Sequence, residues 1–230
     1  MPEHLFMDAV RFCHFVGLAL GIGAGCFADY SIIRNLNAKI TNTDISNLEI
    51  VHGIVWTGLL LLWASGLWLL YARTGFVIEE FTPKLIIKLL VVSILTLNAV
   101  LLGVIAMPTL RKNVNRSFFA FSLSDKLNLG ILAGISTCSW FSGLTLGIFT
   151  ALKPADFSFM LPAFGMVYLT ALAGALLFST MMHVLWERRI EKSKLHLTER
   201  NADMNICFDE TVTRPGERTF SHLLRVNKQL

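Results

Sequence analysis

Two long runs without a single Asp, Glu, Lys or Arg, residues 127–152 and 157–186, constrain this chain more than any other feature. A membrane-spanning helix needs about 20 consecutive, mostly apolar residues. Three further stretches, 12–28, 50–72 and 89–110, also lack those four residue types. Only 16% of the 230 residues are charged and 54% are hydrophobic, whereas about 25% of a typical soluble protein is charged. We therefore expect lipid, not water, to surround most of the chain.

Each run should form a helix, because a helix satisfies all its backbone hydrogen bonds within one segment. The sequence predicts an all-α polytopic membrane protein, a bundle of five transmembrane helices at about 9–33, 50–72, 84–107, 127–152 and 157–186. Ser46–Glu49 has the pattern of a capping box before the second helix. Thr82 and Pro83 fit a cap followed by a first-turn proline. Pro108 marks the expected end of the third helix, and Pro162 falls in the first turns of the fifth.

Lysine and arginine are distributed unequally between the two sets of connecting segments. Four lie on the side of the amino terminus: Arg11, Arg73, Lys84 and Lys153. Eleven lie on the opposite side: Arg34, Lys39, Arg111, Lys112, Arg116, Lys126, Arg188, Arg189, Lys192, Lys194 and Arg200. Because cytoplasmic segments carry the excess of positive residues, we expect the N-terminus outside and the C-terminus in the cytoplasm.

Two parts are expected from the distribution of charge. Residues 1–190 should form the transmembrane domain, and residues 191–230 a cytoplasmic tail that is helical to about Leu195 and partly flexible beyond it. No basic segment precedes the first apolar run, so we expect no cleaved signal peptide. Basic patches with interleaved aromatic residues are missing from the sequence, so nucleic acid is not an expected partner; the lipid bilayer is.

The first run contains the glycine-rich stretch HFVGLALGIGAGCFAD, residues 14–29. The spacing does not match a dinucleotide loop, which needs GxGxxG between a strand and a helix. Instead Gly17, Gly21 and Gly25 recur every four residues, as in a doubled GxxxG motif. One interpretation is close helix packing. The other is a haem b site, with His14 as the axial metal ligand and the three glycines as the floor under the macrocycle. Both interpretations stay open.

Three more polar residues inside the runs are candidates for the same cofactor site. Lys88, one turn into the third helix, either extends towards the interface or binds a haem or porphyrin propionate. His52 and His183 either lie among lipid headgroups, the interpretation we favour, or bind a haem or a quinone. Asp29 is expected to pair with Arg34 or to contact His52.

The stretch CHFVGLALGIGAGCFADYSIIRNL, with ASG at 64–66 and PKLIIKLLVV at 83–92, resembles the HemJ and CopD group of bacterial membrane proteins. The resemblance covers roughly residues 10–105 and places His14 and Lys88 at the group's histidine and lysine positions. It implies a protein of the bacterial inner membrane that binds haem b and oxidises a porphyrin. Such chains usually carry a further histidine where Asn98 and Ala99 stand here. The chain is also similar to uncharacterised five-span membrane proteins.

Three functions remain open at this point. The first is a haem b or porphyrin-binding membrane protein that transfers electrons or oxidises a porphyrin, with the quinone pool as acceptor. The second is a non-catalytic accessory or assembly subunit that docks another membrane protein, or a second copy of itself, through the glycine face of the first helix. The third is a small transporter. The sequence does not decide whether the chain is an enzyme.

Overall fold

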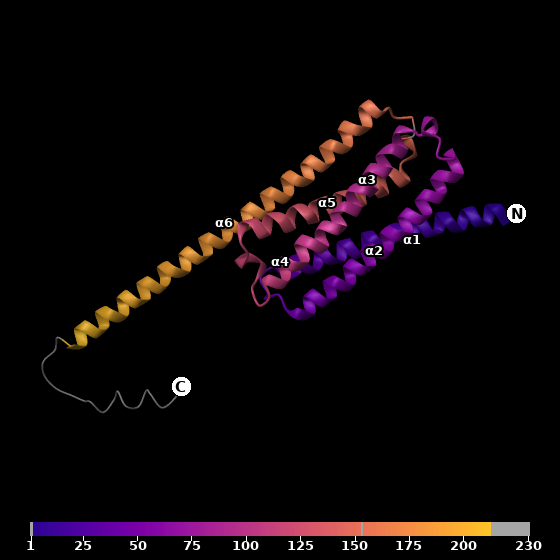
Figure 1. Ribbon diagram of the computed structural model, residues 1–230. Coiled ribbons are helices and arrows are strands. Elements are labelled where there is room, and N and C mark those ends of the chain that lie inside the picture. Colours follow the sequence, from indigo (N-terminus) through magenta and orange to yellow (C-terminus); the bar gives the residue numbers. More distant parts are fainter. Residues whose placement is uncertain (1, 153, 213–230) are drawn as a thin grey trace. The chain divides into compact units, whose positions relative to one another are not determined.

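The computed structural model describes residues 2–152 and 154–212, and this part of the chain is all-α (Figure 1). The long helices are α1 (Pro2–Arg34), α2 (Asn42–Thr74), α3 (Pro83–Leu101), α5 (Leu123–Ile148) and α6 (Phe157–Val212). A π-helical turn, η2 (Leu102–Ala106), joins α3 to the short α4 (Met107–Lys112). Three 3₁₀ turns lie in the connections: η1 (Ile78–Glu80), η3 (Phe118–Ala120) and η4 (Thr150–Leu152). Five of these helical segments are long and apolar enough to cross a membrane, so the chain is a multi-pass membrane protein.

The chain divides within α6 into two compact units, Met1–Val184 and Leu185–Leu230. The expected boundary between the transmembrane domain and the tail, at residue 190, stays a prediction. In the second unit α6 continues to Val212 rather than ending near Leu195, and its side chains between residues 185 and 198 are mostly exposed. Residues 213–230, the last part of the expected tail, lie outside the described residues.

The second long helix, α2, begins at Asn42, eight residues before the apolar run that starts at Ile50. Its capping box is formed by Thr41 and Asp44, not by Ser46 and Glu49. The Thr41 hydroxyl accepts from the Asp44 backbone N–H at 3.2 Å, and the Asp44 carboxylate accepts from the Thr41 N–H at 2.8 Å. Hydrophobicity locates the part of a helix that lies in lipid, whereas polar capping residues end the helix in the headgroup region. The same reason explains why α5, which is capped by the Ser122 side chain, begins before its predicted start.

The third span does not stop at Pro108. It continues through the π-helical turn η2 and α4 to Lys112. Proline has no N–H, so Pro108 cannot bond the carbonyl four residues before it. In η2 the preceding Met107 N–H instead bonds the carbonyl of Leu102, five residues back. This wider turn accommodates the proline without ending the helix. The expected cap at Thr82 and Pro83 is confirmed in position, and Pro162 lies inside α6 near its start.

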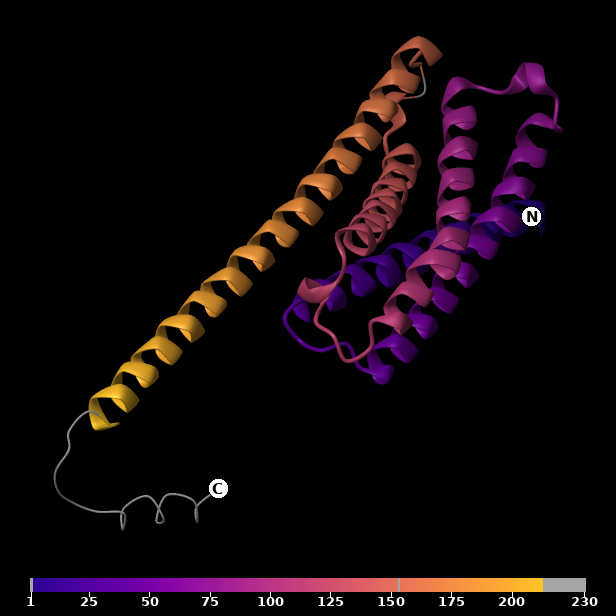
Figure 2. The same ribbon diagram turned by 60° about the vertical axis from the view of Figure 1, so that its left-hand side comes forward.

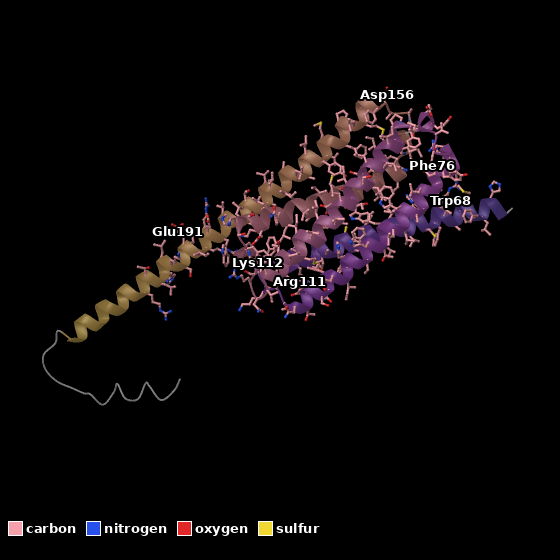
Figure 3. The ribbon with its side chains drawn as sticks, in the orientation of Figure 1. Trp68, Phe76, Arg111, Lys112, Asp156 and Glu191 are labelled. Carbon is pink, nitrogen blue, oxygen red and sulfur yellow. The ribbon has the colours of Figure 1, made fainter. Side chains whose placement is uncertain are left out.

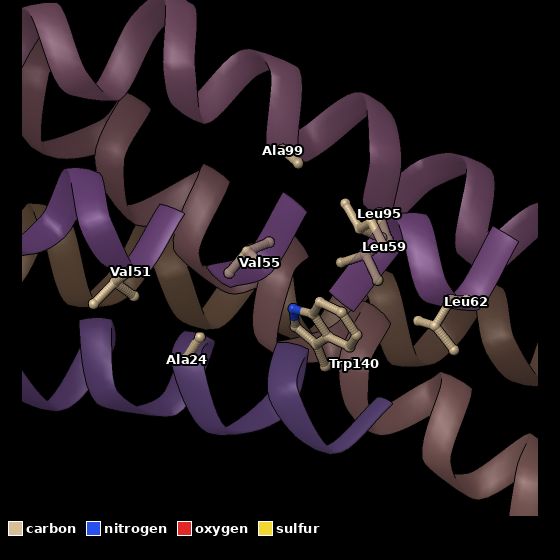
Figure 4. Close-up of a cluster of buried hydrophobic side chains, with 8 residues drawn as sticks. All are labelled: Ala24, Val51, Val55, Leu59, Leu62, Leu95, Ala99 and Trp140. Atoms are coloured by element: carbon tan, nitrogen blue, oxygen red, sulfur yellow. The ribbon is translucent and has the colours of Figure 1, made fainter. Parts of the chain in front are cut away.

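The first unit is built around two helix pairs, α1 with α2 and α3 with α5 (Figure 2). The α1–α2 contact is very close, because a Cβ atom placed on Gly17 would lie 2.9 Å from the carbonyl oxygen of Gly58. Trp140 of α5 lies beside this pair at the centre of the largest buried cluster (Figure 4). The other members of that cluster are Ala24, Val51, Val55, Leu59, Leu62, Leu95 and Ala99.

Large apolar side chains cover much of the outside of the first unit. Leu60 of α2, Val104 of η2 and Leu169 of α6 are each about two-thirds exposed, at 66%, 67% and 66%. Charged and interfacial side chains gather towards the ends, where Figure 3 labels Arg111 and Lys112 at one end and Trp68 and Phe76 towards the other. An apolar surface of this extent is unfavourable in water and favourable in lipid.

The close α1–α2 contact predicts different outcomes for two glycines of the same helix. The Gly17→Ala methyl would meet backbone of α2, so we expect a loss of about 1–3 kcal/mol of stability. No atom lies within 4 Å of a Cβ placed on Gly23. Gly23→Ala should therefore be neutral or stabilising, by up to about 1 kcal/mol from helix propensity. Unfolding of both purified variants in a denaturing-detergent titration tests this, and equal destabilisation of the two would contradict the packing described here.

Candidate functional site

His14 projects from α1 onto α2. Its Nδ1 lies 2.9 Å from the hydroxyl oxygen of Ser65. A Cβ atom on Gly66 would be only 3.4 Å from His14 Cε1, so the missing side chain at Gly66 makes room for the imidazole. Ser65 is 6% exposed and His14 is half-buried. The ring is therefore held at a fixed place within the bundle by a neighbouring helix.

The hydrogen bonds of Ser65 assign the tautomer of His14. The Ser65 hydroxyl donates its one hydrogen to the backbone carbonyl of Leu61. It can then only accept from His14, so Nδ1 carries a hydrogen. In the neutral form of this ring, Nε2 has the lone pair. A neutral imidazole with one nitrogen held by a hydrogen bond and the other free to coordinate is the usual arrangement of a metal-binding histidine.

His14 lines a cavity of about 540 Å³ in the first unit. Its wall is formed by α1, α2, α3 and α5 and consists mainly of apolar side chains. Leu18, Leu95 and Trp140 line the end towards the middle of the bundle, and Arg73 and Gly147 line the opposite end. This volume is within the range of about 300–1,000 Å³ usual for sites that bind small molecules and cofactors.

Three cations and no carboxylate line the same cavity. They are Arg11 of α1, Arg73 of α2 and Lys88 of α3. Arg11 pairs with Asp8, one turn away on its own helix, at 2.8 Å. Among the described residues Lys88 and Arg73 have no hydrogen bond or ion pair, and Lys88 is close enough to interact electrostatically with both His14 and Arg73. The structure thus brings together the two residues that the sequence and the resemblance singled out, His14 and Lys88.

The glycines of α1 do not line this cavity. Gly17 lies against Gly58, and a Cβ on Gly21 would overlap the Trp140 ring, 1.8 Å from its Cη2. A Cβ on Gly25 would lie at the other edge of the same ring, 3.5 Å from Nε1, an ordinary van der Waals contact. The flat group that rests on this face is therefore an indole of the chain itself. The glycines that do line the cavity are Gly66, Gly143 and Gly147, none of which belongs to the glycine-rich stretch of α1.

His52 and His183 do not line the cavity either. His52 Nε2 accepts a hydrogen bond from the Trp56 indole N–H at 3.0 Å. It also lies against the π-helical turn, where a Cβ on Gly103 would be 3.3 Å from the same nitrogen. His183 lies on α6, four residues after Ser179, whose hydroxyl donates to the carbonyl of Lys126. The structure therefore separates these two histidines from the site of His14.

Two other polar residues of the spans have partners on a neighbouring helix. Asn98 is 2% exposed, and its side-chain nitrogen donates to the backbone carbonyl of Leu132 at 3.1 Å. The Asp29 carboxylate accepts from the Thr137 hydroxyl at 2.7 Å. The pairing of Asp29 with Arg34 or His52 was therefore predicted wrongly. Arg34 comes five residues later on the helix, where a side chain does not face that of residue 29.

Residues 2–152 and 154–212 contain no group of three or more His, Cys, Asp or Glu side chains that could hold a metal ion. Compared with protein-family models, with curated proteins and with solved structures, the chain matches none.

The Asp29–Thr137 contact leads to a test of how α1 and α5 are held together. Thr137→Val keeps the side-chain shape but removes the donor, which should lower stability by about 0.6 kcal/mol, and by no more than ~1.7, as for other polar contacts in membranes. Thr145→Val is the matched control on α5, because the Thr145 hydroxyl donates only to Phe141 of its own helix. Equal effects of both substitutions on the detergent unfolding curve would argue against a contribution from the interhelical pair.

Proposed function

We propose that this chain is an integral membrane protein that binds haem b, or a related porphyrin, in the cavity lined by His14. The observation that carries the proposal is the state of the imidazole. Ser65 holds Nδ1, so in the neutral ring Nε2 would have the lone pair, in an apolar cavity large enough for a cofactor. Histidine nitrogen is a standard axial ligand of haem iron.

The charges of the cavity support an anionic ligand. Lys88 and Arg73 lie on two different helices at one part of the wall and have no carboxylate among the lining residues. A cation in a membrane-embedded cavity is costly without a counter-ion. A haem or porphyrin carries propionate groups on an otherwise apolar ring. It would satisfy the cations and the apolar wall together, with Lys88 as the first candidate partner of a propionate.

The shape of the wall also suits a flat ring. Gly143 and Gly147 lie on one face of α5, one turn apart. A Cβ on Gly143 would meet only the end of Leu18, at 3.9 Å, and one on Gly147 would meet nothing within 4 Å. These two positions, rather than Gly17, Gly21 and Gly25, would accommodate the edge of a macrocycle.

A bound haem would supply one-electron transfer, and the residues of this chain would bind, orient and charge-balance it. With the N-terminus outside, Lys88 and Arg73 would lie near the outer face of a bacterial inner membrane, where a membrane quinone is available as electron acceptor. Porphyrin oxidation is the corresponding activity implied by the resemblance to HemJ-type proteins. The accessory-subunit alternative needs the α1 glycine face for a partner. Gly17 and Gly21 already face groups of the same chain, which favours the cofactor interpretation.

The absorption spectrum of the purified protein tests the proposal. Protein expressed with haem precursors and purified in detergent should have a Soret band that shifts on reduction. His14→Ala should abolish the band, because no other described histidine lines the cavity. His196→Ala, on the exposed part of α6, is the control and should keep it. A wild-type protein that is folded and has no Soret band would refute haem binding.

The residues around His14 should have graded effects on haem affinity. Ser65→Ala removes the acceptor of Nδ1–H, and loss of such a supporting hydrogen bond typically weakens binding about 10–100-fold. Lys88→Gln should weaken binding of haem but less so of its dimethyl ester, which has no charged propionates. Lys192→Gln, an exposed lysine of α6, is the control. Equal loss of affinity for haem and its ester in Lys88→Gln would show that Lys88 does not bind a propionate.

A further inference from the structure

The two helices on one side of the cavity, α1 and α5, touch at only one part of their length. They meet closely where Trp140 of α5 fills the space left by Gly21 and Gly25 of α1. Trp140 is 2% exposed and lines the inner end of the cavity. The contact between the two helices is therefore tight at the closed end of the cavity.

Beyond Trp140, on the cavity side, α1 and α5 separate. The next two lining positions of α5 are glycines, Gly143 and Gly147. The nearest atom to a Cβ on Gly143 is 3.9 Å away on Leu18, and nothing lies within 4 Å of a Cβ on Gly147. Phe15, which lines the cavity from α1, is 60% exposed. No side chain of α5 fills the gap between these helices.

The opposite side of the cavity, between α2 and α3, is lined by bulky groups. Trp63 of α2 donates its indole N–H to the Thr96 hydroxyl of α3 at 2.9 Å. Leu67 and Leu89 also line the wall on this side. Glycines bound one side of the cavity. Larger side chains, two of them joined by a hydrogen bond, bound the other side. We therefore expect the cavity to open on the glycine side.

The gap between α1 and α5 lies inside the apolar runs. Phe15 and Leu18 belong to the uncharged stretch 12–28, and Gly143 and Gly147 to the uncharged stretch 127–152. Hydrocarbon chains, not water, surround these parts of a membrane-spanning helix. We propose that the cavity opens laterally to the bilayer between α1 and α5, so that lipid acyl chains enter it and its ligand is taken up from the membrane. The identity of that ligand rests on the proposed function, whereas the route does not.

Quenching of Trp140 fluorescence by brominated lipid tests the route without any cofactor. The full-length protein keeps Trp140, and its other tryptophans, Trp56, Trp63, Trp68 and Trp186, are replaced by Phe. It is reconstituted into phosphatidylcholine vesicles with plain or brominated acyl chains. Trp140 should be strongly quenched although it is almost fully buried, because bromine atoms reach it through the cavity. If this variant does not fold, the Trp140 signal is obtained as the difference between wild type and Trp140→Phe.

Two substitutions on opposite sides of the cavity provide the matched comparison. Gly143→Leu, and separately Gly147→Leu, fill the gap between α1 and α5 and should remove most of the quenching. Leu67→Phe enlarges a side chain of the α2 side and should leave it unchanged. Circular dichroism and gel filtration confirm that each variant is folded. The route is overturned if Trp140 is not quenched, if neither glycine variant reduces the quenching, or if Leu67→Phe reduces it equally.

The quenching experiment and the absorption spectrum test separate claims, so either claim can be rejected while the other is retained. Quenching that depends on Gly143 or Gly147, in a protein without a Soret band, retains the lateral opening and rejects haem as the ligand. A Soret band in a protein whose Trp140 is not quenched retains haem and rejects entry from the bilayer.

Discussion

The close approach of α1 and α2 at Gly17 and Gly58 determines where the polar groups of this bundle meet. Neither glycine has a Cβ atom, so the two backbones come together at a distance that any other residue would prevent. Because the helices run in opposite directions, residues before Gly17 on α1 lie against residues after Gly58 on α2. That register brings His14 against Ser65 and Gly66. The position of the imidazole therefore depends on a backbone contact elsewhere on the same helix face.

Trp140 plays the complementary role between α1 and α5. Its indole occupies the space left by Gly21 and Gly25, which brings α5 against α1 at one point. The same ring lines the inner end of the cavity. Since Gly143 and Gly147 follow on α5 without side chains, the helices separate immediately beyond the ring. Trp140 thus fills the core at the inner end of the cavity. Beyond it, next to Gly143 and Gly147, the cavity stays open.

The sequence predicts the number of spans and several of the helix boundaries. Runs without charged residues, capping residues and prolines all act through interactions that are local in the sequence. Thr82 and Pro83, at the start of α3, are examples. It does not predict where α2 begins or how the third span passes Pro108, since helix ends depend on polar caps outside the lipid and a π-helical turn depends on neighbouring packing. The pattern of Gly17, Gly21 and Gly25 predicts that a closely packed helix or a flat group lies on that face of α1. An indole and a macrocycle both require a missing Cβ, so spacing alone does not distinguish Trp140 from a cofactor.

The residues that the structure places in one cavity are more informative than the glycines. Lys88 and Arg73 come from different helices, and neither has a counter-ion among the described residues. In a membrane, two like charges close together are unfavourable unless an anion lies between them. A small inorganic anion would neutralise them but would leave the apolar remainder of about 540 Å³ without contacts. An amphiphilic anion satisfies both requirements, and under the proposed function Nε2 of His14 would select, among such molecules, one that carries a metal.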